Sequence, residues 1–331
     1  MLNRVYIAIG ILLILVMAAA FVVPRLYDWN VYRERVEAIA AEALGTDVAI
    51  RGNMGFTLLP QPQMVISDIV VGDAETPLLE IERADAHLNL MEFLRDIYAV
   101  QQLNLDGLKL HLTVDEQGEW RMPIQLPQGV RQGNVSIEDA VLSNAEIVLA
   151  DQRTGESWRM DRINGNLSAA GLRGPFALDA TGQMQNEDYL LRLSSSELNN
   201  AGQMRLNSLI APTDRRFSLT TEGLLSTEDS KAAFAGETNL RVKPQRRDEN
   251  DVRGDLTLKA KIALDAQELA IEEFNLVPDE NRPGTRMIGN ATLSLGNDRH
   301  LDALVSGGVV PIIPQDALRD RTADPYALVA L

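Results

Sequence analysis

The hydrophobic pattern divides the chain into an apolar run, a helical stretch and a long region of two-residue alternation. Residues 5–23 contain no charged residue, no Asn and no Gln. At about 1.5 Å rise per residue, a helix of this length nearly crosses the roughly 30 Å hydrocarbon layer of a bilayer. The run therefore predicts a single transmembrane anchor. Ala18, Ala19 and Ala20 leave a cleaved signal peptide as the alternative, but the run continues through Val23, which favours an uncleaved span.

The charges on either side of this run give little information about its orientation. Arg4 and the terminal amine precede it, whereas Arg25, Arg33 and Arg35 follow it. Basic residues are enriched on the cytoplasmic side of a span, so the two flanks oppose each other. The very short N-terminal flank favours a cytoplasmic N-terminus and a body on the other side of the membrane.

A second, amphipathic helix is predicted at residues 30–44. Val31 and Ile39 belong to an apolar stripe with helical spacing, Asn30 can cap the first turn, and Gly45 can end the helix. Such a stripe is typical of an ordinary core helix. Because this helix follows the apolar run so closely, we expect it to plug the end of the body nearest the bilayer.

From residue 46 onward, apolar and polar residues alternate, as in strands with one apolar face. The alternation recurs roughly a dozen times or more, with turn formers between the runs, and no second broad helical stripe follows residue 96. Residues 100–114 have the pattern of a hairpin, because Asp106-Gly107 is a two-residue turn signal between two alternating runs. The pattern predicts a mainly β body.

A half-apolar sheet has to cover its apolar face, and the sequence supplies few helices to do so. The sheet could fold onto itself as a sandwich, close into a small barrel, or curl into a trough whose inner face holds lipid. Sandwich cores usually contain large aromatic side chains, whereas aromatic residues make up 5% of this chain. This composition favours the trough, with the sandwich still open.

Charge and cysteine content narrow the possible partners. The formal net charge is -16, from 31 basic and 47 acidic residues. Such a balance argues against nucleic acid and against anionic lipid headgroups, so contact with lipid beyond the anchor is expected to be apolar. The chain has no cysteine, which is ordinary for a bacterial envelope protein and less usual for a secreted eukaryotic domain.

Residues that could carry catalysis are few and scattered. His87, His111 and His300 lie far apart, and no zinc motif, nucleotide loop or serine-hydrolase elbow is present. Adjacent acidic pairs such as Glu272-Glu273 point to opposite faces of a strand, which does not suit a glycosidase acid and base. We expect no enzyme, no metal site and no cofactor, with an exported carbohydrate-active enzyme as a minor alternative.

Three segments carry a family resemblance: DWNVYRERVEAIAAEALGTDVAIRGNMGFTLLPQPQMVISDIVVGD after the apolar run, the hairpin-like VQQLNLDGLKLHLTVDEQGEW, and the strand unit of residues 135–184. Together they resemble the AsmA family of bacterial envelope proteins. The resemblance implies an inner-membrane anchor, a periplasmic β-rich body and kinship with bridge-like lipid-transfer proteins. It also implies a role in outer-membrane assembly and lipid homeostasis, and it supplies no catalytic residues.

Together, these patterns predict a transmembrane anchor at residues 1–24, an AsmA-like N-terminal domain at 25–125, a repeated β-strand groove region at 126–310 and a truncated C-terminal segment at 311–331. The expected fold is mainly β, with a transmembrane helix, an amphipathic helix and a long curled antiparallel sheet that has an apolar groove. Family members are usually longer, so the chain is expected to be a fragment or a short member.

The expected function is lipid binding or lipid transfer by a protein anchored in the bacterial inner membrane, with phospholipid acyl chains, the inner membrane and outer-membrane assembly components as partners. The alternative is a non-catalytic scaffold for outer-membrane protein assembly with a closed sandwich body. The candidate residues of the lipid groove are Leu88, Leu90, Leu103, Leu105, Leu108, Leu110, Leu112, Val114, Ile147, Leu149, Phe176, Leu178, Leu256, Leu258, Ile262 and Leu264.

Overall fold

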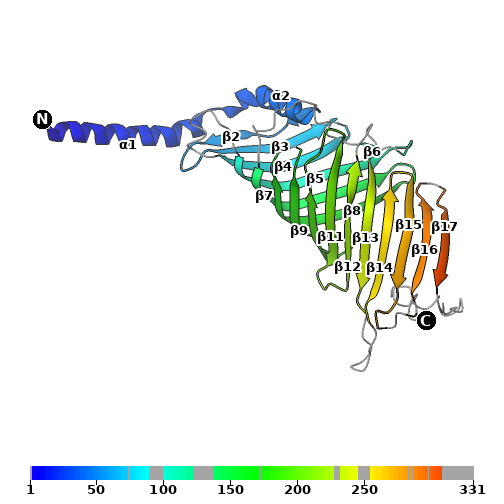
Figure 1. The fold of residues 1–331 in the computed structure, drawn as a ribbon. Coiled ribbons are helices and arrows are strands. Elements are labelled where there is room, and N and C mark those ends of the chain that lie inside the picture. The colour runs from blue at the N-terminus through cyan, green and yellow to red at the C-terminus, as the bar shows by residue number, and fades with distance from the viewer. Residues whose placement is uncertain are drawn as a thin grey trace. The chain divides into compact units, whose positions relative to one another are not determined.

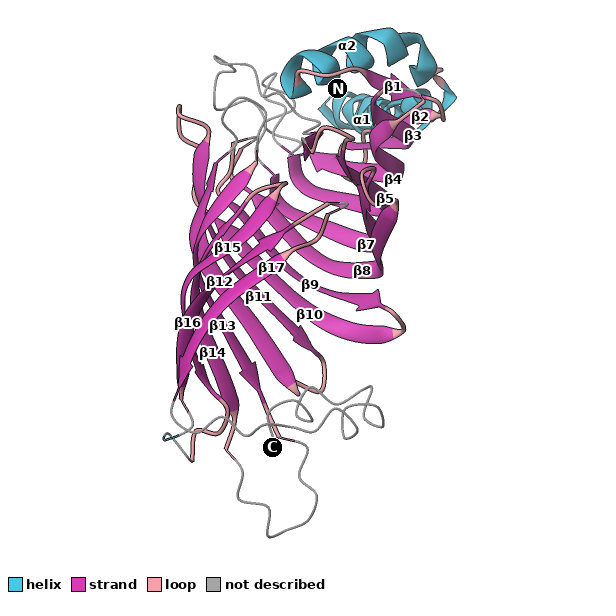
Figure 2. Cartoon of the chain, turned by 90° about the vertical axis from the view of Figure 1, so that its right-hand side faces the viewer, coloured by secondary structure: helices cyan, strands magenta, loops and turns pink. Residues whose placement is uncertain are grey.

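The computed structural model describes residues 2–73, 75–88, 100–118, 120–121, 137–171, 173–226, 232–244, 254–281, 284, 286–296 and 298–307. Helices occur near the N-terminus and strands make up most of the rest, as the colours of Figure 2 show. The predicted mainly β class is therefore confirmed. The candidate residue Leu90 lies outside the described residues.

The N-terminal helices are α1 (Leu2–Leu26), the 3₁₀ helix η1 (Trp29–Tyr32) and α2 (Arg33–Leu44). The predicted cap at Asn30 is wrong, because Asp28 accepts a hydrogen bond from the Asn30 N–H and begins η1. The predicted end at Gly45 is confirmed, since Gly45 takes φ +67° and its N–H bonds to the Ala41 carbonyl.

No single helix with described side chains is long and apolar enough to cross a membrane. The segments Ile11–Leu26 and Trp29–Glu42 satisfy this condition only as a pair, with a bend of 68° between them.

The described strands belong to one long hydrogen-bonded sheet, and the strand pairs whose register is described are antiparallel. The strands are β1 (Val48–Ile50), β2 (Met54–Thr57), β3 (Gln63–Gly72), β4 (Pro77–Leu88), β5 (Val100–Val114), β6 (Trp120–Arg121), β7 (Ile137–Asp151), β8 (Glu156–Ala169), β9 (Phe176–Met184), β10 (Glu187–Ser195), β11 (Gln203–Pro212), β12 (Phe217–Ser226), β13 (Ala233–Val242), β14 (Leu256–Leu264), β15 (Glu268–Val277), β16 (Met287–Ser294) and β17 (Leu301–Gly307).

Two compact units divide the chain. The first contains Met1–Leu112, Met122–Val148 and Arg159–Phe176, and the second contains Thr113–Arg121, Leu149–Trp158 and Ala177–Leu331. In the first unit, β1 and β2 both pair with β3, which pairs with β4, which pairs with β5. The short β1 and β2 therefore share one neighbour, and they lie next to the N-terminal helices.

Helix α2 is fixed to this part of the sheet by polar contacts. The Glu37 carboxylate accepts a hydrogen bond from the Ile50 N–H at 2.6 Å, and Arg33 Nη2 donates to the Gly52 carbonyl at 2.8 Å. These bonds satisfy backbone groups at the end of β1 and in the turn that follows it. They hold α2 along β1.

The strand β5 runs without interruption from Val100 to Val114, so the predicted hairpin at Asp106-Gly107 is wrong. Asp106 lies opposite Arg83 and Leu108 lies opposite Ile81, which means that β4 accompanies β5 through the expected turn. Gly107 takes φ +64°, and a Cβ atom built on it would lie 2.5 Å from the Glu82 Cδ. A left-handed glycine within a paired strand thus replaces the turn.

Other strands of the first unit use the same left-handed backbone. Asp68 in β3, Asn144 in β7 and Arg162 in β8 have φ values of 51°, 53° and 50°. At each such residue the alternation of apolar positions changes phase, as from Leu103 and Leu105 to Leu108 and Leu110 in β5. In β7 three small or aliphatic residues from both sides of Asn144 are buried, with exposed fractions of 1% for Ala140, 7% for Leu142 and 2% for Ala145. The phase change keeps these apolar side chains buried together.

In the second unit, β9 to β17 form an antiparallel meander in which each strand pairs with the next, as Figure 1 shows for the strands from green to orange. The register shifts between Lys261 and Ile262 of β14 and between Ile271 and Phe274 of β15. These bulges move one strand by a residue without breaking the ladder.

Candidate functional site

Residues directly opposite each other on antiparallel strands point to the same face of a sheet, so successive registers define rows that cross the meander. Three such rows of the second unit contain no polar or charged side chain, and we call the face that carries them the apolar face. The rows are Ile210, Leu219, Leu240, Leu258, Leu276 and Met287; Leu206, Gly223, Gly236, Ile262, Ile271, Ala291 and Ala303; and Met204, Leu225, Phe234, Leu264, Leu269, Leu293 and Leu301.

A fourth row, between the first and the second, carries small hydroxyl groups as well. It consists of Ser208, Thr221, Thr238, Ala260, Phe274, Gly289 and Val305. The hydroxyls of Thr221 and Thr238 lie 3.3 Å apart and satisfy each other. The row therefore interrupts the aliphatic surface without introducing a charge.

Glycines flatten parts of the apolar face. Gly223 lies directly opposite Gly236, and Gly289 lies opposite Phe274. A Cβ atom on Gly289 would lie 2.9 Å from atoms of the Phe274 ring, so this ring covers the glycine. Aromatic rings placed over strand glycines compensate for the missing side chains.

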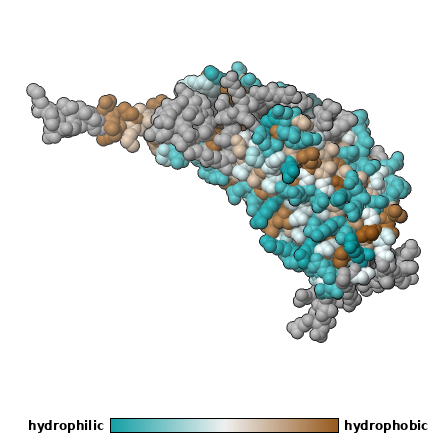
Figure 3. Space-filling view, viewed as in Figure 1, coloured by the Kyte–Doolittle hydropathy of each residue, from teal (hydrophilic) through white to brown (hydrophobic). Residues whose placement is uncertain are grey.

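Most side chains of the apolar face are half-buried, and exposure increases towards β17. Leu256 is 7% exposed and Leu264 is 37% exposed, whereas Leu301 and Val305 on β17 are 63% and 51% exposed. Hydrophobic residues also gather at the edge formed by β16 and β17 in Figure 3, where Ile288 and Leu304 are exposed on the other face. Aliphatic surface of this extent is unusual on a protein face in contact with water.

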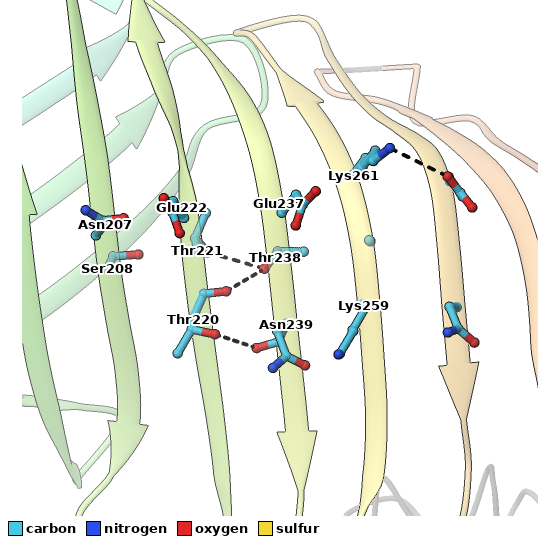
Figure 4. A pocket seen from close by; sticks show the side chains of 13 residues that line it. Asn207, Ser208, Thr220, Thr221, Glu222, Glu237, Thr238, Asn239, Lys259 and Lys261 are labelled. Carbon is cyan, nitrogen blue, oxygen red and sulfur yellow. Dashed lines mark hydrogen bonds and ion pairs between the residues drawn. The ribbon is translucent and has the colours of Figure 1, made fainter. Parts of the chain in front are cut away.

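The opposite face of the same strands is polar. Asn207, Glu222, Glu237, Lys261 and Glu273 follow one another across β11 to β15. They line an open hollow of about 590 Å³, in which Lys261 Nζ lies 3.8 Å from a Glu273 carboxylate oxygen (Figure 4). The sheet is therefore amphipathic, with charge on one side and aliphatic groups on the other.

The structure brings the predicted groove residues of β14 together on the apolar face. Leu258 lies between Leu240 and Leu276, and Ile262 lies between Gly236 and Ile271. The remaining members in this meander have similar surroundings: Leu256 is opposite Val242, Leu264 is opposite Phe234 and Leu269, and Leu178 is opposite Leu193.

The predicted residues of β5 also lie opposite apolar residues. Leu103 is opposite Ala86, Leu105 is opposite Ala84, Leu108 is opposite Ile81, and Leu110 is opposite Leu79. Leu105 and Val114 are buried, whereas Leu112, Ile147, Leu149 and Phe176 are half-buried on β5, β7 and β9. Leu88 ends β4, and nothing is described of its side chain.

Sequence reasoning missed most of the apolar face outside β14. Residues of β11, β12, β13 and β15, such as Ile210, Leu219, Leu240 and Leu276, lie in the same rows as Leu258. Their own strands alternate, but Thr221, Gly223 and Gly236 weaken the apolar period there. The register with β14 would have been needed to recognise them.

Arg153 joins two turns of the second unit that are far apart in the sequence. Arg153 donates to the Asp151 carboxylate from Nε at 3.0 Å and from Nη2 at 2.8 Å, and its Nη1 donates to the Ala266 carbonyl at 2.6 Å. We call these three residues the Arg153 clasp. The hydrogen bonds from Arg153 hold the pKa of Asp151 below its ordinary value, although burial of the carboxylate acts in the opposite direction.

Glycines allow other turns to approach the clasp. A Cβ atom on Gly118 would lie 3.1 Å from Arg153 Nη1, and one on Gly296 would lie 3.6 Å from it. Nearby, the Arg299 guanidinium forms an ion pair with Glu156. The ends of β7 and β8 are thereby tied to the turns that connect β14 to β15 and β16 to β17.

The histidines are placed without a common partner. His111 lies 3.3 Å from Glu80 and His300 lies 3.1 Å from Asp302. Within the part of the chain that the structure describes, no three His, Asp or Glu side chains are grouped to hold a metal ion.

Fold and surface define a mainly β protein with an apolar N-terminal helix and a long sheet whose strands in the second unit carry an aliphatic face. A family model of the AsmA family matches residues 2–161. Over these residues the match confirms the resemblance to the AsmA family found in the sequence. No curated protein and no solved structure matches the chain.

Proposed function

We propose that the chain is a lipid-binding and lipid-transfer protein of the bacterial envelope, anchored in the inner membrane by α1 with its body in the periplasm. The apolar face of the second unit would line a hydrophobic groove that holds phospholipid acyl chains, and the apolar residues of β5 in the first unit would contact acyl chains in the same way. This activity would contribute to outer-membrane assembly and phospholipid homeostasis, as the family resemblance implies.

The observation that carries the proposal is the run of apolar rows across β11 to β17. Moving a methylene group out of water stabilises it by about 0.8 kcal/mol. An aliphatic row offers this stabilisation at every position and makes no directional bond, so an acyl chain can move along it without breaking one. Leu264, Leu301 and Val305 retain the exposure that such contact needs.

The proposed anchor rests on the surface of α1. The large apolar side chains from Ile11 to Val23 are 46–67% exposed. Leaving such a helix in water is unfavourable, whereas a bilayer covers it and satisfies its backbone internally. A bilayer is therefore the environment that suits α1.

Mass spectrometry of lipids that copurify with the chain tests the proposal. The full chain, extracted in a mild detergent and exchanged into lipid-free detergent, should retain phospholipid in a constant molar ratio. A lipid-free preparation of a well-folded chain would contradict lipid binding and would support the scaffold alternative.

A further inference from the structure

A short stretch that begins with the last residue of α1 exposes apolar and aromatic side chains. Leu26 is 81% exposed, Val31 is 72% exposed, and Tyr27 and Tyr32 are 47% and 42% exposed. We call these four residues the collar. They follow the exposed apolar side chains of α1 without a charged stretch between them, apart from Arg25 and Asp28.

The collar residues lie around Trp29 in the chain, and the Trp29 side chain is less exposed than they are. The Trp29 ring is half-buried, with its centroid 5.1 Å from that of Tyr27, 6.0 Å from that of Tyr32 and 5.0 Å from that of Phe56 in β2. Its Nε1 donates to the Pro24 carbonyl at 2.7 Å. One side chain thus links the last turn of α1, the collar and the sheet.

Further hydrogen bonds hold the collar against the first strands. The Asn30 side-chain oxygen accepts from the Met54 N–H at 3.1 Å and from Arg33 Nη2 at 3.0 Å. The same Arg33 nitrogen donates to the Gly52 carbonyl. With this many bonds, the connection between α1 and the sheet is a structured joint rather than a flexible linker.

The direction of the chain changes at the collar. The segments Ile11–Leu26 and Trp29–Glu42 are bent by 68° relative to each other. If α1 crosses the bilayer, the chain therefore turns towards the membrane plane within the collar, and tilts of about 20° are common for spanning helices. A turn at this depth places the collar where hydrocarbon meets headgroups.

We propose that the collar is a docking surface for the boundary between the headgroups and acyl chains of a lipid bilayer. Tyrosine suits this boundary because its ring is apolar and its hydroxyl can remain hydrated, and Leu26 and Val31 supply aliphatic contact. The collar sets the depth of α1 and keeps β2, which Trp29 contacts through Phe56, next to the membrane. The proposal rests on the proposed anchoring of α1.

Continuity with α1 favours a bilayer over a protein as the occupant. A protein partner on such a site would leave the adjoining apolar surface of α1 uncovered, whereas a bilayer covers both at once. The described charges close to the collar are of both signs, with Arg25 and Arg33 basic and Asp28 and Glu34 acidic, so the surface has no charge pattern that would select a protein ligand.

Spin labels test the proposal in the full-length chain, whose lack of cysteine makes single labels unambiguous. Val16→Cys, Val31→Cys and Asp47→Cys variants, each carrying a nitroxide, are reconstituted into phosphatidylethanolamine–phosphatidylglycerol vesicles. Val16 reports on the anchor, Val31 on the collar, and the exposed Asp47 on a position in water. Relaxation by oxygen, which concentrates in lipid, is compared with relaxation by a water-soluble nickel chelate.

The Val31 label should be relaxed several-fold more by oxygen relative to nickel than the Asp47 label, and less than the Val16 label. If the Val31 label has the same ratio of oxygen to nickel relaxation as the Asp47 label, while the Val16 label remains in lipid, the collar does not dock on the bilayer. The proposed anchoring of α1 would then still be supported. If the Val16 label also matches Asp47, the anchoring itself is wrong, and the collar proposal fails with it. All three labelled positions are exposed, so the labelled chains are expected to fold, and melting curves verify this.

Discussion

Arg153 forms a bidentate ion pair with Asp151, with Nε–Oδ1 and Nη2–Oδ2 distances of 3.0 and 2.8 Å. Both side chains are largely buried, at 12% and 10% exposure, and Arg153 adds a bond to the Ala266 carbonyl. Removing the Arg153 side chain leaves the buried Asp151 carboxylate without its charged partner, although the backbone N–H of residue 153 still donates to it. We expect Arg153→Ala to lower the free energy of unfolding by about 2 to 4 kcal/mol.

Denaturant unfolding of the purified chain measures this loss. Arg192→Ala is the matched control, because Arg192 pairs with Asp179 at an exposed site where both side chains are more than 60% exposed. An exposed pair of this kind contributes less than about 1 kcal/mol. Equal losses for the two variants would show that the clasp has no special role.

The clasp also predicts a dependence of stability on pH. The pKa of Asp151 is lowered in the folded chain, so the unfolded chain binds its proton at higher pH than the folded chain does. The stability from this carboxylate is therefore complete above its unfolded pKa of about 3.9 and is lost as the pH falls through the lower folded value. Unfolding free energies measured between pH 3 and pH 6 should fall more steeply towards acid in the wild-type chain than in Asp151→Asn. If the unfolding free energies of the two chains change with pH in parallel, the attribution of this pH dependence to Asp151 is contradicted.

Matched substitutions at two strand residues with a left-handed backbone should have opposite effects on stability. Gly107→Ala should destabilise the first unit by about 1 to 2 kcal/mol, because φ +64° strains an L-residue and the Glu82 side chain would have to move away from the new Cβ. Asn144→Gly, at φ 53°, should be neutral or stabilising, since glycine removes the same strain. Thermal unfolding of both variants checks this, and a stable Gly107→Ala chain would argue against the kinked continuous strand.

A charge on the apolar face should separate lipid binding from folding. Leu264 is 37% exposed, so Leu264→Glu should cost little stability but place a carboxylate among acyl chains. Lys259→Glu introduces the same group on the polar face of the same strand. We expect copurified phospholipid to fall several-fold in Leu264→Glu and to stay unchanged in Lys259→Glu. Equal lipid content in both variants would contradict the proposal that lipid binds at the apolar face beside Leu264.

The strands with regular alternation could be predicted from sequence, and the exceptions have local physical causes. Leu256 to Leu264 alternate without a break and form β14 as expected. The dipeptide Asp106-Gly107 suits both a hairpin turn and a left-handed kink within a strand. The pairing of β5 with β4 decides between the two structures. The apolar alternation changes phase between Leu105 and Leu108. This change was the sequence signal for a kinked, continuous strand, because a hairpin does not require it.

Contacts between distant segments could not be predicted. Arg153 and Ala266 are separated by 113 residues, and no pattern around either one indicates the other. The same limit applies to Asn30, which has a side chain suited to capping but bonds to Met54 of β2, while Asp28 caps η1. Local propensity names the residues that can form such bonds, and the fold selects the partner.

The most direct measurement of the central claim is photo-crosslinking along β14. A benzoylphenylalanine residue is introduced one position at a time from Leu256 to Leu264 in cells that synthesise labelled phospholipid. Lipid adducts should appear at Leu258, Ala260 and Ile262, which belong to the apolar face, and should be weak at Thr257, Lys259 and Lys261 between them. Adducts without this two-residue period, or none at any position in a folded chain, would contradict the proposal that the apolar face holds lipid.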